Sequence, residues 1–178
     1  MYLMSVISVL LMIISMILYR IFRYSFSLSC AITFGTVSYH FLMRLSVGLI
    51  IDSSMNNKAD YSKKWYRSSL WEKRLYKLIK VKKWKSRVPT FEPDYFEHQN
   101  HDWREIAQAM CQAEIVHEVI FVLSFIPIAF SHWFGALPIF IITSILAAVT
   151  DLVFVIIQRY NRPRVIKLIE KNDMHKYQ

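Results

Sequence analysis

The sequence predicts an all-α protein: a four-helix transmembrane bundle with a cytoplasmic amphipathic interfacial helix between membrane helices two and three. Two observations predict this fold. The 178 residues are 54% hydrophobic, and the apolar residues gather in two long blocks on either side of a polar, basic stretch. Three glycines and two cysteines leave no glycine-rich phosphate-binding loop, zinc spacing or disulfide framework. The length suggests a single domain.

The first apolar block predicts two membrane helices, because a bilayer core needs about 20 mostly apolar residues per helix. Residues 2–19 carry no charge, and the apolar pattern resumes after Arg20 and Arg23 and continues to Ile51. We expect helices over about 2–20 and 25–51, joined by a tight turn. The first is expected to be an anchor and not a signal peptide, since it lacks a basic start and a small-residue cleavage site.

The second apolar block, 115–157, is also too long for one helix. It contains a turn signal at 132–138, where Gly135 and Pro138 interrupt the pattern. We expect helices over about 113–132 and 137–159. An acidic residue at each end of the block, Glu118 and Asp151, then lies within the membrane or at its inner edge.

The distribution of basic residues predicts the orientation. Most of the 22 lysines and arginines lie in the polar stretch 52–113 or after Gln158. The positive-inside rule places both regions, and both termini, in the cytoplasm.

The polar stretch contains an amphipathic segment over 61–88. Its apolar side chains share one helical face and its lysines lie largely elsewhere, a pattern typical of a helix in the headgroup plane. The apolar face consists of Trp71, Leu75, Leu78 and Ile79. Nucleic-acid binding is not expected, because the segment is tethered between membrane helices. Pro89 and Pro93 then break the chain, and Asp102 with Glu105 resembles a capping box for a helix from Trp103.

The ionisable residues of the predicted spans fall near one depth. They are His40, Arg44, Glu114, His117, Glu118 and Asp151. Such residues are costly in a bilayer and mark function by default. A structural interpretation has Arg44 neutralise Asp151 or Glu118. A catalytic interpretation makes one histidine a general base, oriented by a carboxylate, in a cleft at the inner leaflet. A metal site is a third possibility, but only one Glu-x-x-His motif is present, and no metal is expected.

The fourth span ends in QRYNRPR, residues 158–164. Pro163 biases Arg162 away from helical geometry, so the chain is expected to turn there. The three guanidiniums and the amide suit a phosphate, or else anchor the chain to headgroups. The polar side chains of this segment are Gln158, Arg159, Asn161, Arg162 and Arg164.

QRYNRPR resembles the C-terminal signature of the bacterial glycosyl-4,4'-diaponeurosporenoate acyltransferase family, small membrane proteins of carotenoid (staphyloxanthin) synthesis. Residues 82–85 followed by Pro89 are similar to the family's central W-K-x-x-x-P segment. Residues 111–117 are similar to its A-E-x-x-H segment. The resemblance covers roughly residues 35–170.

The resemblance implies transfer of a fatty acyl group to a sugar hydroxyl of a glycosylated lipid at the inner leaflet of a bacterial cell membrane. It implies that Glu114 and His117 are active-site residues and that the polar side chains of 158–164 bind the acyl donor or a lipid headgroup. At two positions the sequence departs from the family's pattern: Glu118 stands where an aromatic residue is common, and Asp151 stands where an amide is common. Both add charge to the substrate-binding cleft, which favours an acceptor other than a polyene.

We therefore expect an integral membrane O-acyltransferase in which Glu114 orients His117 and His117 deprotonates the acceptor. Arg44 or His40 would stabilise the oxyanion. The expected partners are a lipid acceptor, acyl-CoA or acyl-carrier protein as donor, and the phospholipid bilayer; no cofactor is expected. With no Ser-His-Asp or Cys-His spacing, transfer would be direct. The alternatives are a non-catalytic lipid-binding or assembly protein, and a small methyltransferase- or reductase-like enzyme. The oligomeric state stays open.

Overall fold

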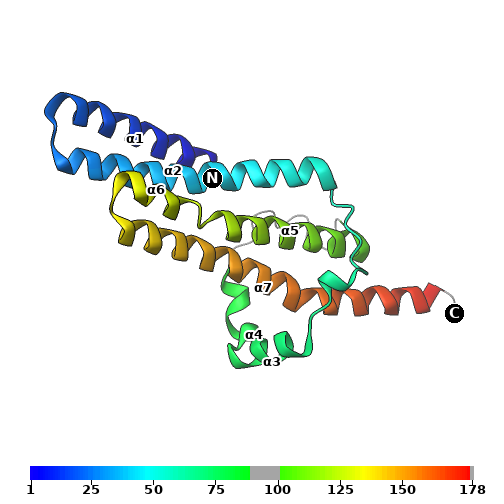
Figure 1. The fold of residues 1–178 in the computed structure, drawn as a ribbon. Helices are drawn as coiled ribbons and strands as arrows, with labels where there is room; N and C mark the ends of the chain where they lie inside the picture. The colour runs from blue at the N-terminus through cyan, green and yellow to red at the C-terminus, as the bar shows by residue number, and fades with distance from the viewer. Residues whose placement is uncertain (89–100, 177–178) are drawn as a thin grey trace. The chain divides into compact units, whose positions relative to one another are not determined.

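A computed structural model describes residues 1–88 and 101–176 (Figure 1). It is 85% helical, and the described residues contain no strand, so the predicted all-α class is confirmed. Four helices are long and apolar enough to cross a membrane: Tyr2–Phe22, Ser25–Met55, Trp103–Phe134 and Leu137–Met174. Pro89 and Pro93, expected to break the chain, lie outside the described residues.

The chain divides into two compact units, described here one at a time. The first comprises 1–50 and 119–151. It contains α1 (Tyr2–Phe22), α2 (Ser25–Met55) as far as Ile50, the end of α5 (Trp103–Leu123), α6 (Pro127–Phe134) and the start of α7 (Leu137–Lys176). A Cβ added at Gly35 of α2 would meet the Met12 sulfur of α1 at 3.4 Å, so these helices pack closely.

The predicted third span is interrupted in this unit. Helix α5 ends at Leu123 and α6 begins at Pro127, with a turn between them. Proline has no N–H to donate but is well suited to a first helical turn, so it separates the two helices. Gly135, with a φ of 68°, ends α6 where the turn was predicted.

The second unit comprises 51–118 and 152–178. The predicted interfacial segment is not one helix here but a series of short ones. These are η1 (Lys64–Tyr66), α3 (Leu70–Leu78), α4 (Val81–Trp84) and η2 (Lys85–Arg87). Helix α3 begins with a capping box between Ser69 and Glu72, and Lys80 in the left-handed region separates it from α4. Trp71 and Leu78 are exposed, and their placement at a membrane surface stays a prediction.

Two long helices frame the second unit. Helix α5 begins at Trp103, where the Asp102 N–H donates to the Glu105 carboxylate at 3.2 Å, as the capping pattern predicts. The expected turn at Pro163 is wrong: α7 continues through it to Lys176 (Figure 1). Proline cannot donate the helical hydrogen bond to the carbonyl of Arg159. The Ser68 hydroxyl donates to that carbonyl instead, at 3.0 Å, and leaves it satisfied.

Candidate functional site

The first unit holds a polar cluster inside its apolar helices. Arg44 of α2 forms an ion pair with Asp151 of α7 and donates a second bond to the Ala147 carbonyl at 3.3 Å. Asp151 is one of the two partners, Asp151 or Glu118, that the structural interpretation offered for Arg44. Asp151 is 1% exposed, and a guanidinium is the partner that offsets the cost of burying this carboxylate.

His40 lies one helical turn before Arg44 and is also buried. Among the described residues, neither ring nitrogen of His40 has a hydrogen-bond partner. Its neighbour Tyr39 is satisfied by the Leu123 carbonyl at 2.9 Å and meets the imidazole edge-on. A buried polar group without a partner is costly, so His40 is a candidate for contact with a ligand.

The second unit holds a larger cluster around Glu114, which is fully buried on α5. One Glu114 oxygen accepts from Arg159 at 2.7 Å, and the other lies 2.5 Å from Arg162. The two arginines lie on α7 at i and i+3, which places both on the face that meets α5. Glu114 thereby joins α5 to α7 through two charge-assisted contacts.

Arg162 is as buried as Glu114, with no exposed surface. Its guanidinium donates to the Tyr66 carbonyl at 2.7 Å and lies 5.0 Å from the Tyr66 ring centroid. Tyr66 and Cys111, which both contact Arg162, belong to one buried core cluster with Ala59. Burial raises the pKa of the Tyr66 hydroxyl, which therefore stays neutral beside these charges.

Arg159 is partly accessible and carries more acidic partners than Arg162. Its Nε lies 2.6 Å from Glu72 of α3, and its Nη1 lies 3.7 Å from Glu118. Burial acts to raise the pKa of Glu72, but its bonds from the Ser69 N–H and Arg159 outweigh burial and lower it. Arg159 thus connects α3 to α5 by charge.

His117 and Glu118 complete the α5 side of this cluster. The imidazole of His117 stacks on Phe154 of α7, with ring centroids 4.6 Å apart, and it is partly exposed. Glu118 accepts from the Trp65 indole at 3.2 Å. Both oxygens of the Glu114 carboxylate contact arginines, Arg159 and Arg162. The orientation of His117 by Glu114 stays a prediction.

The remaining predicted residues lie on α7. Gln158 is buried, Asn161 accepts from Lys85 at 2.5 Å, and Arg164 donates to the Tyr160 hydroxyl at 2.8 Å. The predicted layer of ionisable groups draws on both units, so its convergence stays a prediction. Among the described residues, no group of three or more His, Cys, Asp or Glu side chains could hold a metal ion.

Sequence reasoning missed Glu72, Ser68 and Lys85 as partners of the C-terminal segment. The capping-box spacing of Ser69 and Glu72 was a visible signal for the start of α3, but not for the contact of Glu72 with Arg159.

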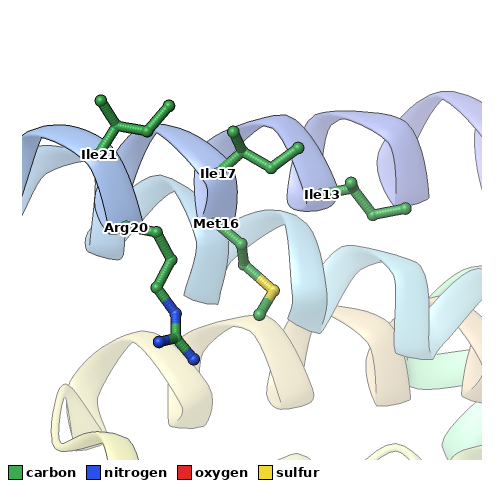
Figure 2. A pocket seen from close by; sticks show the side chains of 5 residues that line it. All are labelled: Ile13, Met16, Ile17, Arg20 and Ile21. Atoms are coloured by element: carbon green, nitrogen blue, oxygen red, sulfur yellow. The ribbon is translucent and has the colours of Figure 1, made fainter.

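A separate pocket of the first unit is lined by α1 alone, by Ile13, Met16, Ile17, Arg20 and Ile21 (Figure 2). Its walls are almost entirely apolar, and it contains none of the predicted catalytic residues.

A family model described as glycosyl-4,4'-diaponeurosporenoate acyltransferase matches residues 62–171. The match contains all of α3 and the whole Glu114–Arg159–Arg162 cluster. No curated protein and no solved structure matches the chain.

Proposed function

Because the chain belongs to the glycosyl-4,4'-diaponeurosporenoate acyltransferase family, we propose that it moves a fatty acyl group onto a hydroxyl of a glycosylated or other polar lipid at the inner leaflet. The observation that carries this proposal is the Glu114–Arg159–Arg162 cluster. Its Glu114 and Arg162 are buried, it joins the two long helices α5 and α7 one helical turn from His117, and it lies inside the matched residues.

In this reaction the partly exposed imidazole of His117 takes the proton of the acceptor hydroxyl. The oxygen attacks the acyl carbonyl carbon of a thioester donor, the new C–O bond forms, and the C–S bond breaks. The departing thiolate recovers the proton from the imidazolium. The stacking of His117 on Phe154 supports this role, because it fixes the plane of the imidazole ring.

The buried arginines have a supporting part in this proposal. Arg162 pairs with the Glu114 carboxylate inside the protein, and Arg159 connects that carboxylate to α3. The roles predicted for His40 and Arg44 in oxyanion stabilisation stay predictions.

The test is an acyl-transfer assay on the full chain in lipid nanodiscs, with labelled acyl-CoA or acyl-carrier protein and an extract of bacterial lipids as acceptor. His117→Ala is expected to lower the rate about 10²- to 10⁴-fold, the usual contribution of a general base. The matched control is His132→Ala, an exposed histidine of α6, which is expected to keep the wild-type rate.

The outcomes separate the alternatives. If the wild-type protein transfers no acyl group to any lipid, while lipids still bind, a non-catalytic lipid-binding role replaces this proposal. If His117→Ala retains wild-type turnover, the base is another residue. Binding of a nucleotide cofactor in place of the acyl donor would favour the methyltransferase- or reductase-like alternative.

A further inference from the structure

Two cations of the second unit meet on one tyrosine ring. The Lys85 Nζ lies 5.2 Å from the ring centroid of Tyr160, and the Arg164 Cζ lies 4.3 Å from the same centroid. Neutral groups hold both in place: Asn161 accepts from Lys85, and the Tyr160 hydroxyl accepts from Arg164. Tyr160 is itself fixed by an edge-to-face contact with Tyr76.

This pair differs from the other arginines of the 158–164 segment. Arg159 and Arg162 are neutralised by Glu72 and Glu114. Within the part of the chain that the structure describes, no carboxylate forms an ion pair with Lys85 or Arg164. Partial burial and then the charge of Arg164 lower the pKa of Lys85, as expected for two like charges held close together.

The geometry points to a phosphate-binding site formed by Lys85 and Arg164. A phosphate would relieve the repulsion between the two cations and accept from both. The planar guanidinium offers paired donors, and the ammonium acts as a mobile point charge. Since it names the donor or headgroup subsite of the acyl transfer, this inference rests on the proposed function. The ligand class is a phosphate ester, from a soluble acyl donor or from a phospholipid headgroup.

The arginines of the 158–164 segment have different roles in this proposal. Arg162 has no exposed surface and holds α5 to α7, whereas Arg164 is exposed and can reach a ligand. Lys85 comes from η2, far away in sequence, so a ligand held by both residues would bridge the short-helix segment and α7. The phosphate-binding capacity expected of the whole segment is thereby assigned to one of its three arginines and to a lysine outside it.

The experiment measures binding, not turnover, so that its failure is distinct from a failure of the proposed function. The full chain is placed in nanodiscs of phosphatidylcholine alone, and its affinity for pyrophosphate and for coenzyme A is measured by calorimetry. A second set of nanodiscs contains phosphatidylglycerol. The variants are Lys85→Gln and Arg164→Gln. The controls are Lys83→Gln and Lys171→Gln. They replace exposed lysines of α4 and α7 and so remove one positive charge each, as the site variants do.

We expect each site variant to weaken binding of the soluble phosphates at least about tenfold and each control variant less than twofold, since a contact with a charged group is worth this much. If soluble phosphates bind and phosphatidylglycerol does not compete, the source is the acyl donor. If only phosphatidylglycerol binds, and binding depends on Lys85 and Arg164, the source is a headgroup. Equal losses in the site and control variants would overturn the site in favour of diffuse electrostatic attraction, as would binding that none of the variants changes.

Discussion

A fully buried arginine needs compensation for its charge, and the terminal nitrogens of Arg162 have it, whereas its Nε has no hydrogen-bond partner among the described residues. Glu114, the Tyr66 carbonyl and the Tyr66 ring surround its guanidinium. Removing one partner of a buried pair leaves the other charge uncompensated, whereas removing both charges together is far milder. The pair therefore specifies how α5 and α7 meet inside the second unit.

This compensation predicts a large stability effect. Arg162→Met is expected to lower the free energy of unfolding by about 3–5 kcal/mol, because the Glu114 carboxylate loses a buried partner. The measurement is thermal unfolding in detergent. Adding Glu114→Gln to Arg162→Met is expected to recover part of the loss. Unfolding of Arg162→Met at the wild-type temperature would contradict this account of the cluster.

His40 gives the opposite stability prediction. Both of its nitrogens lack a hydrogen-bond partner among the described residues, so an apolar ring of similar shape removes an unsatisfied buried group. His40→Phe is expected to raise the free energy of unfolding by about 1 kcal/mol or more. If His40 serves acyl transfer, the same variant loses activity while gaining stability. A stabilised variant with unchanged turnover would remove His40 from the catalytic residues.

At the scale of elements, α7 continues through Pro163, and another segment supplies the donor that the proline lacks. The Ser68 hydroxyl donates to the Arg159 carbonyl, which receives no helical hydrogen bond because Pro163 has no N–H. This contact also ties the start of the short-helix segment to α7. The local sequence pattern predicts a turn, but the structure has a continuous helix with a distant residue bonded to the carbonyl that Pro163 leaves without its helical donor.

The contact predicts a specific coupling between Ser68 and Pro163. Ser68→Ala is expected to cost about 1 kcal/mol in the wild-type background, because it leaves the Arg159 carbonyl without its donor. In a Pro163→Ala background the helix supplies its own N–H, and the same change is expected to cost almost nothing. A double-mutant cycle on unfolding free energies measures the coupling. Equal costs in both backgrounds would show that Ser68 does not act through this carbonyl.

Helix α3 is held to α7 by a pH-sensitive contact. The lowered pKa of Glu72 means that its contribution to stability is present above the ordinary value near 4.5 and is lost as the pH falls through the lower value of the folded protein. Lowering the pH from 6 to 3.5 is expected to lower the protection of the Leu70–Leu78 amides against hydrogen exchange, measured relative to the intrinsic exchange rate at each pH. Glu72→Gln is expected to exchange faster already at pH 6, with a smaller response to acid. Equal acid responses in the variant and the wild type would assign the effect to another carboxylate.

How far the sequence predicts this molecule depends on the range of the interaction concerned. The apolar runs predict all four membrane helices, because burying them in lipid needs only local composition. The pairing of Arg44 with Asp151 was foreseen as one alternative, since few ionisable groups lie within the apolar blocks. The contact of Glu72 with Arg159 could not be foreseen, because a long polar segment offers many partners and only the fold chooses among them.

At the scale of the whole molecule, the distribution of charge is the basis for a membrane topology. The chain carries a net charge of +9, and its basic residues gather in the connecting stretch and after Gln158. Arg20, in the last turn of α1, and Arg23, at its C-cap, are the main exceptions. The positive-inside rule then predicts a cytoplasmic second unit, in which His117 and the Glu114–Arg159–Arg162 cluster would be accessible to a donor made in the cytoplasm.

This topology is testable with single-cysteine variants in which Cys30 and Cys111 are replaced by serine. Tyr24→Cys, at an exposed position in the α1–α2 turn, is expected to react with a membrane-impermeant maleimide in spheroplasts, whose cytoplasmic membrane is intact. A cysteine at Met174, exposed near the end of α7, is expected to react only after the membrane is permeabilised. The reverse pattern would place the second unit outside the cell. A cytoplasmic thioester donor could then not reach His117, and the proposed acyl transfer would need a donor from the outer face.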